Sequence, residues 1–321
     1  MRRGREEGDS EGESGFCEDV VGDLCQNEER RDHCLGEECE MRYEKACIGS
    51  IGYALPETVV TSLELERRLG PLYERLRLVE GRLELMSGIR ERRFWAKGTL
   101  PSQAAARAGR DALARLPQLA PESIDCLIHC AVSRDFVEPA TSTAVHRLLG
   151  LGNHVMNFDI SNACLGMATG VLMLANMVEL GQIRAGLAVC GENAGPLVEN
   201  TVERLNADLT QTRRSIKDQF ASLTIGSCAA AIVVASRDVL PDGHSLLAAA
   251  TCTDTSSNNL CQGDANGGMT DGSAPLMATD SEALLHAGVA AAQRMWTELK
   301  RETGWDENTP NLVCTDRKSV V

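Results

Sequence analysis

The chain has 321 residues, of which 43% are hydrophobic and 3% aromatic, and its 32 basic and 46 acidic side chains give a net charge of -14. A chain of this length forms one large domain or two ordinary ones and can bury a sizeable core. The negative net charge argues against a nucleic-acid-binding surface. Because no 18-residue apolar run and no apolar N-terminus occur, we expect neither a membrane span nor a secretory signal, and we expect a cytoplasmic protein.

The first forty residues differ in composition from the rest of the chain. They hold 14 acidic and 5 basic residues and almost no periodic apolar residue, so they cannot bury a core. They also hold four of the thirteen cysteines: Cys17, Cys25, Cys34 and Cys39. We expect residues 1–40 to be a disordered or mistranslated extension, with Met41 as the natural start. Metal binding by the four cysteines is a remote alternative, because their spacings match no paired zinc motif.

After residue 41, short apolar runs alternate with helical patterns, which predicts an α/β layered fold. In chain order the predicted strands cover 47–55, 125–132, 155–160, 185–190, 229–235 and 246–252. An alanine-rich helix is predicted at Ser102–Leu116, with Ser102 as its cap, and a second helix at Cys164–Leu180. The nine later cysteines lie mostly in apolar runs, and we expect them to be reduced thiols.

A weak internal repeat is visible. The helix Ser102–Leu116 and the strand Asp125–Val132 recur as Ser281–Lys300 and Asn311–Thr315. This predicts two similar halves, residues 41–236 and 237–315, the second of them incomplete. Residues 316–321 neither continue nor cap the last predicted strand, so we expect a non-native tail on a truncated gene.

The most informative position is Cys164, which the pattern places at the turn between a strand and a helix. That helix is apolar nearly all round and is predicted to be buried centrally. A thiol at the N-terminus of a helix meets the positive end of the helix dipole, which favours the nucleophilic thiolate. The small residues Gly166, Ala168 and Gly170 are expected to leave room for a substrate chain. The alternative is a structural cysteine at a tight turn.

The segment Asn162-Ala-Cys-Leu-Gly-Met-Ala-Thr-Gly170 resembles the nucleophile turn of the 3-oxoacyl-[acyl-carrier-protein] synthase III family, within the thiolase superfamily. Four further stretches carry the same resemblance: residues 47–56, 87–93, 131–139 and 223–231. It extends from residue 41 to residue 315. It implies a five-layered α-β-α-β-α fold built of two pseudo-repeated halves, with the second half incomplete here. Within that family, the sequence is most similar to the olefin-biosynthesis subgroup that condenses two fatty acyl-CoA molecules.

Glu138 is the residue that points to this subgroup, because it stands 26 positions before Cys164 in a Ser-Arg-Asp-x-x-Glu-Pro context. The resemblance implies that Glu138 reaches across a dimer interface and removes a proton next to the thioester carbonyl of the partner's substrate. A carboxylate held in an apolar acyl tunnel is suited to act as a general base. Without the resemblance, a surface loop carboxylate is the favoured interpretation.

The resemblance also implies the reaction, a Claisen condensation. Cys164 takes an acyl group from acyl-CoA, and a second thioester, acyl-CoA or malonyl-acyl carrier protein, attacks the acyl-enzyme to give a β-ketoacyl thioester. Coenzyme A or the carrier protein serves as substrate carrier, and we expect no cofactor and no metal. The complete protein is expected to be a homodimer. No residue is assigned to CoA binding: the basic run at Arg90, Arg92 and Arg93 is either a phosphate contact or a solvated face.

Position 316 is Asp316, where the family has a catalytic histidine, and the family's later His-Gly-Asn segment is not found. We therefore expect the chain itself to be inactive in condensation. The alternative from another functional class is a catalytically dead paralogue that acts as structural partner in a heterodimer.

His129, inside an apolar strand, is interpreted as a satisfied core histidine, and Glu192 is assigned no role.

Overall fold

The computed structural model describes residues 41–263 and 276–313. Contacts group residues 42–321 into one compact unit and residues 1–41 into another, of which only Met41 is described. The predicted extension at 1–40 with its four cysteines, Asp316 and the predicted tail at 316–321 lie outside the described residues. The division into halves near residue 237 stays a prediction.

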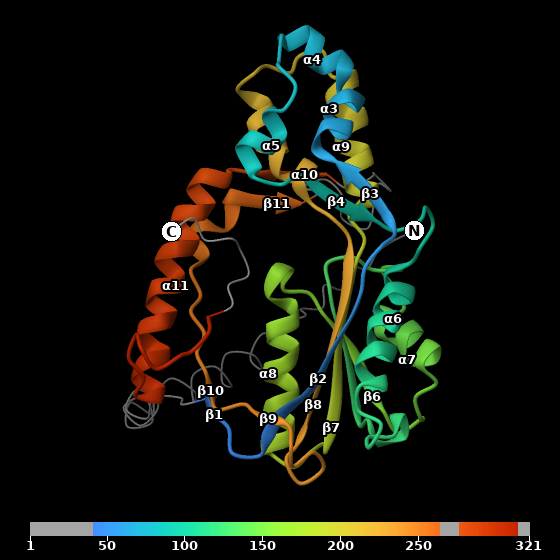
Figure 1. Ribbon diagram of the computed structural model, residues 1–321, viewed down its shortest axis with the longest axis vertical. Coiled ribbons are helices and arrows are strands. Elements are labelled where there is room, and N and C mark those ends of the chain that lie inside the picture. The colour runs from blue at the N-terminus through green and yellow to red at the C-terminus, as the bar shows by residue number, and fades with distance from the viewer. Residues whose placement is uncertain (1–40, 264–275, 314–321) are drawn as a thin grey trace, which may run out of the picture. The chain divides into compact units, whose positions relative to one another are not determined.

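A mixed six-stranded sheet forms the centre of the larger unit, with the strand order β6-β5-β7-β8-β2-β9 (Figure 1). Strand β5 pairs in parallel with β6 and β7, while β8 pairs antiparallel with both β7 and β2. The strands are β2 (Ala46–Ala54), β5 (Cys126–Cys130), β6 (Met156–Ile160), β7 (Ala185–Glu192), β8 (Cys228–Ser236) and β9 (His244–Ser245). The predicted α/β fold and its first five sheet strands are thus confirmed.

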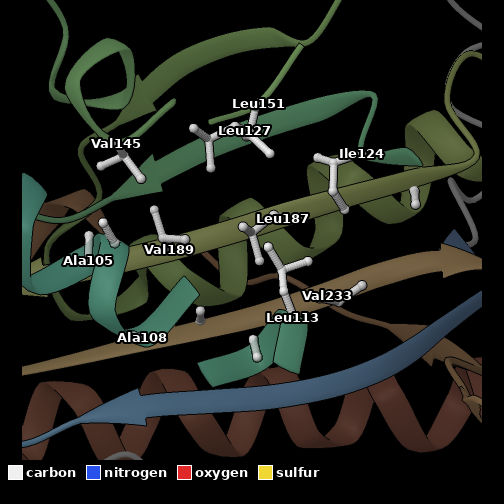
Figure 2. Close-up of a cluster of buried hydrophobic side chains, with 14 of the residues drawn as sticks. Ala105, Ala108, Leu113, Ile124, Leu127, Val145, Leu151, Leu187, Val189 and Val233 are labelled. Carbon is white, nitrogen blue, oxygen red and sulfur yellow. The ribbon is translucent and has the colours of Figure 1, made fainter. Parts of the chain in front are cut away.

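Helices cover both faces of this sheet. Helices α6 (Pro101–Ala114) and α7 (Thr141–Leu149) lie on one face and α8 (Gly166–Glu179) on the other (Figure 1). The largest buried cluster lies between the sheet and α6, where alanines on the helix let the backbones approach closely, and Figure 2 shows part of it. The alanine-rich helix is confirmed, but its predicted cap is wrong. Leu100 is the N-cap, and the Ser102 N–H donates to Asp135 instead.

A second group of short helices has its own buried cluster. It contains α3 (Ser62–Arg68), α4 (Gly70–Leu76), α5 (Arg82–Ser87), α9 (Gly195–Ala207) and α10 (Phe220–Thr224), with the hairpin of β3 (Thr58–Thr61) and β4 (Glu91–Phe94). Glu66 is buried here and accepts hydrogen bonds from the Tyr73 hydroxyl (3.0 Å) and the N–H groups of Gly81 (2.5 Å) and Leu83 (2.6 Å). This carboxylate therefore has a structural role, because all its oxygens are used.

The later part of the chain departs from the predicted pattern. Helix α11 (Ser281–Thr303) confirms the predicted second-half helix. Only β10 (Ala248–Ala249) forms within the strand expected at 246–252. The strand expected at 311–315 is wrong for the residues described, since 311–313 form no strand and Leu312 and Val313 are exposed. An apolar run becomes a strand only when a neighbour completes its hydrogen-bond ladder.

The remaining elements of the described chain are short. They are β1 (Met41–Arg42), β11 (Cys261–Gly263), β12 (Met277–Thr279) and the 3-10 helices η1 (Pro121–Ser123), η2 (Ala163–Leu165), η3 (Ser215–Gln219) and η4 (Thr255–Leu260).

Candidate active site

Cys164 lies in the 3-10 turn η2, between β6 and α8, and its side chain is exposed. The preceding residue, Ala163, has a φ of 44°, which is a strained conformation for a residue with a Cβ. Strain of this kind persists where the surrounding structure enforces it, and it clusters at functional sites. The predicted strand–turn–helix placement is confirmed, although α8 begins two residues after the thiol.

Side-chain hydrogen bonds lock the turn around Cys164. The Asn162 side-chain amide donates to the Thr169 hydroxyl (2.9 Å), which donates to the Leu165 carbonyl (2.9 Å). The Leu165 N–H donates to the Asn162 carbonyl (3.0 Å). These bonds join the residues on both sides of the thiol, so Cys164 is held in a fixed turn without being covered.

Gly166 and Gly170, two of the three small residues expected to leave room for a substrate chain, face the end of β5, and the third, Ala168, is exposed. A Cβ at position 166 would lie 3.1 Å from the Cys130 carbonyl oxygen, and one at position 170 would overlap the Cys130 sulfur. Both glycines therefore bring α8 against the end of β5. The helix expected to be buried centrally is only partly buried within the described residues. Val171, Leu174 and Val178 face the sheet, whereas Met173 and Asn176 are exposed.

Glu138 lies in the loop that joins β5 to α7, and it is exposed. Its neighbours Phe136 and Val137 are 60% and 67% exposed, so the loop tip is an apolar surface that carries one carboxylate. No hydrogen bond or ion pair among the described residues connects Glu138 with Cys164. The two residues follow adjacent parallel strands, β5 and β6, whose carboxyl ends meet at the same edge of the sheet.

The base of the Glu138 loop is held by Glu192, at the end of β7. Its carboxylate accepts hydrogen bonds from the N–H groups of Val132 (2.8 Å) and Ser133 (3.2 Å) and from the Ser133 hydroxyl (2.7 Å). The sequence alone assigns Glu192 no role. The available signal was a carboxylate at a strand end together with a hydroxyl residue after the neighbouring strand.

Two aspartates connect the same loop to the helices beside it. Asp135 accepts from the N–H of Ser102 (2.9 Å), and its own N–H donates to the Thr141 hydroxyl (3.2 Å). Asp159, on β6, accepts from the N–H groups of Thr141 and Ser142 (2.8 Å each) at the start of α7. A carboxylate at a helix N-terminus satisfies N–H groups that have no partner within the helix.

His129 is fully buried on β5, as the sequence indicated, but it is not satisfied. Neither ring nitrogen has a hydrogen-bond partner among the described residues, and Nδ1 lies 3.9 Å from an Asp159 oxygen. Burial lowers the pKa of His129, against the opposing influence of the Asp159, Glu192 and Asp135 carboxylates. The imidazole is therefore held neutral beneath the three carboxylates that hold the loop.

The other candidate groups have structural positions. Arg92 is buried and donates to the Val60 carbonyl (3.3 Å) and the Ser62 hydroxyl (2.9 Å), while Arg93 donates to the Pro56 carbonyl (3.0 Å). A phosphate role is therefore excluded for Arg92, whose side chain is enclosed. Within residues 41–263 and 276–313, no group of three or more His, Cys, Asp or Glu side chains could hold a metal ion, and no helix is long and apolar enough to span a bilayer.

Thiol exposure alone does not single out Cys164. Cys228, Cys252 and Cys261 are also exposed, whereas burial raises the pKa of the Cys130 thiol to about 12. What separates Cys164 from the others is its position in a strained turn between a strand and a helix.

Comparison with known proteins identifies relatives over most of the chain. No family model matches it. The acyl-CoA:acyl-CoA alkyltransferase of Shewanella oneidensis is 34% identical over 88% of this chain and 82% of its own length. The acyl-CoA:acyl-CoA alkyltransferase of Xanthomonas campestris is also 34% identical, over 83% of this chain and 75% of its own length. A β-ketoacyl-[acyl-carrier-protein] synthase III of Deinococcus radiodurans is 36% identical over 45% of this chain and 40% of its own length.

Solved structures of OleA from Xanthomonas campestris share the fold. One superposes with a TM-score of 0.76 at 33% identity, covering 84% of this chain and 75% of that one. Variants substituted at a glutamate, a cysteine and a histidine of that protein have been crystallised, as have complexes with cerulenin and with lauric acid and lauroyl-CoA. Its substituted glutamate precedes its substituted cysteine by 26 positions, which is the spacing of Glu138 and Cys164.

Proposed function

The chain belongs to the acyl-CoA:acyl-CoA alkyltransferase family of the thiolase superfamily, and from that premise we propose that Cys164 and Glu138 divide between them the two stages of a Claisen condensation. The protein is an acyltransferase of the type that joins an acyl group held on the enzyme to a second acyl thioester. That the chain itself is inactive in condensation stays a prediction. The observation that carries the residue assignment is the exposed thiol in a strained turn, with a carboxylate 26 positions earlier on the loop after the adjacent strand.

In the first stage the Cys164 sulfur attacks the thioester carbonyl of an acyl-CoA. The carbon–sulfur bond to coenzyme A breaks, the acyl group stays on Cys164, and coenzyme A leaves as the free thiol with the proton that Cys164 loses. Backbone N–H groups of the turn, including that of Cys164, would stabilise the oxyanion. The fixed turn supports this role because attack requires a sulfur held in one place.

In the second stage Glu138 removes a proton from the carbon next to the thioester carbonyl of a second acyl-CoA. The carbanion attacks the carbonyl of the acyl group on Cys164, the Cys164 thiolate leaves, and the product is a β-ketoacyl thioester. No decarboxylation is needed, which fits a donor that is an ordinary acyl-CoA rather than a malonyl thioester. The lauroyl-CoA complex of the Xanthomonas protein makes lauroyl-CoA the first probe to use.

A second copy of the chain is the proposed partner. Strand β6 is an edge strand of the sheet, paired only with β5 within the described residues, and its first residue, Met156, is 47% exposed. Phe136 and Val137 on the neighbouring loop are exposed as well, and so is Glu138. An unpaired edge beside exposed apolar side chains suits association with another sheet edge. Pairing there would carry Glu138 toward the other copy.

Coenzyme A release tests the first stage. The protein is mixed with excess lauroyl-CoA, the reaction is quenched at short times, and free coenzyme A is measured by chromatography. We expect a burst that approaches one coenzyme A per chain, lost in Cys164→Ala and retained in Cys252→Ala, which removes another exposed thiol. A burst of equal size in Cys164→Ala would refute the proposed nucleophile.

A further inference from the structure

The end of β7 has a partner on one side only. The last pair between β5 and β7 is His129 with Val189, while β7 continues to Glu192 in register with β8. On the β5 side the chain leaves the sheet after Cys130 and becomes the loop that carries Glu138. Backbone N–H groups of this loop have therefore lost the strand neighbour that would accept their hydrogen bonds.

The Glu192 side chain takes the place of that missing strand neighbour. One carboxylate oxygen accepts from the Val132 N–H, and the other accepts from both the N–H and the hydroxyl of Ser133. The Ser133 hydroxyl oxygen in turn accepts from the Asn193 N–H at 3.0 Å. Hydrogen bonds to a carboxylate are about twice as strong as neutral ones, so this base is held more firmly than an ordinary turn.

A second anchor lies two residues further along. Asp135 joins the loop to the start of α6 through Ser102 and to the start of α7 through Thr141. The four residues that follow, including Glu138, are exposed. The loop thus has a hydrogen-bonded base, residues 132–135, and a projecting tip, residues 136–139.

We propose that Glu192 is a positioning residue that fixes the direction in which the loop presents Glu138. This inference rests on the proposed role of Glu138 as the base of the second stage. Without the Glu192 carboxylate, two N–H groups and one hydroxyl of the loop base lose their acceptor, and the loop tip can adopt a wider range of positions. Since a displacement of about 1 Å can cost about 100-fold in rate, proton removal should fall steeply while acyl transfer to Cys164 continues.

The chain offers a matched control. One Glu179 oxygen accepts from the N–H groups of Glu44 (3.0 Å), Lys45 (2.6 Å) and Ala46 (2.7 Å), before and at the first residue of β2. Like the Glu192 carboxylate, the Glu179 carboxylate accepts three hydrogen bonds, but none of them comes from the Glu138 loop. Glu179→Ala should therefore lower the free energy of unfolding about as much as Glu192→Ala does, without changing the rate of proton removal.

The test follows deuterium exchange at the carbon next to the carbonyl of lauroyl-CoA, in D2O, by mass spectrometry. It is run in the Cys164→Ala background, so that the thioester is not consumed. We expect Glu192→Ala to slow the exchange at least 10-fold, Glu192→Gln to recover part of it because one acceptor oxygen remains, and Glu179→Ala to leave it unchanged. In the Cys164 protein, Glu192→Ala should retain the coenzyme A burst. Backbone hydrogen exchange at Val132 and Ser133 should accelerate only in the Glu192 variants.

Two failures are distinguishable. If lauroyl-CoA shows no catalysed exchange, or if Glu138→Ala does not reduce it, the proposed base is wrong and the positioning role falls with it. If Glu138→Ala abolishes exchange but Glu192→Ala leaves it intact, or if the Val132 and Ser133 amides keep their protection in Glu192→Ala, the inference about Glu192 alone is overturned.

Discussion

Gly170, on the second turn of α8, faces Cys130 at the end of β5 so closely that a Cβ at position 170 would overlap the Cys130 sulfur. This contact sets the distance between α8 and the end of β5. Because Cys164 precedes α8 by two residues, it also sets the position of the thiol. Strand β5 is thus a common support: its end carries the Glu138 loop, and its last residue contacts the helix behind Cys164.

Gly170→Ala should therefore weaken both stability and acyl transfer. Overpacking of this kind costs about 1–3 kcal/mol, and we expect a lower unfolding midpoint and a slower coenzyme A burst. The double variant Gly170→Ala/Cys130→Ala should recover both, since the next atoms, the Cβ atoms of Ala188 and Cys130, lie 3.6 and 3.7 Å away.

Gly288→Ala on α11 is the control for the glycine substitution, because a Cβ there meets no atom within 4 Å. It should leave acyl transfer unchanged and stabilise the helix slightly. If the double variant is no better than Gly170→Ala, the contact with Cys130 does not set the position of α8.

Glu138→Gln should separate the two stages. Loss of a general base typically costs 100- to 10,000-fold, so deuterium exchange into lauroyl-CoA should fall by at least 100-fold. The coenzyme A burst, which needs only Cys164, should be unchanged. A burst that falls together with the exchange would contradict the division of roles, and a circular dichroism spectrum and melting curve would show whether the variant is folded.

The proposed dimer gives a third prediction. Met156→Lys places a charge on the exposed edge strand β6, and we expect it to shift sedimentation from dimer to monomer. Deuterium exchange should fall with it, because Glu138 is proposed to act in the other copy. Met295→Lys on α11, also at an exposed methionine, is the control. A protein that sediments as a monomer at all concentrations would refute the proposal.

Stability should depend on pH through His129. Burial lowers its pKa in the folded state, so just below about pH 6.5 the unfolded chain binds a proton that the folded chain does not. The free energy of unfolding should then decrease as the pH falls from 7.5 to 5, by at most about 1.4 kcal/mol per pH unit for one proton.

His129→Leu should flatten this dependence, because it removes the group that is buried neutral and unpaired. His286→Leu, at an exposed histidine on α11, should not. Chemical denaturation at a series of pH values measures both. An unchanged slope in His129→Leu would assign the acid sensitivity to other groups.

Much of the sheet could be predicted because most of its strands are short, mainly apolar runs. Strand β5, every residue of which is buried, shows the pattern of a strand covered on both faces. The alanines of α6 predict a helix that packs closely, and α6 does so against β2, β7 and β8. Local pattern failed for 311–313, whose apolar residues have no neighbouring strand to pair with in the part of the chain that the structure describes.

The site was predicted where a local signal exists and missed where it depends on contacts across the sheet. Cys164 stands out because the strand and the helix on either side of it are adjacent in sequence. Glu192 acts 59 and 60 residues away from Ser133 and Val132, and only the pairing of β5 with β7 brings them together. His129 was correctly placed in the core, but its unpaired nitrogens depend on what surrounds it in three dimensions.

The most direct test of the central claim is to locate the acyl group after a single turnover. The protein is mixed with lauroyl-CoA, quenched in acid, digested and analysed by peptide mass spectrometry. The account predicts one lauroyl thioester, on the peptide that contains Cys164. A lauroyl group on another cysteine, or none on Cys164 while coenzyme A is released, would contradict it.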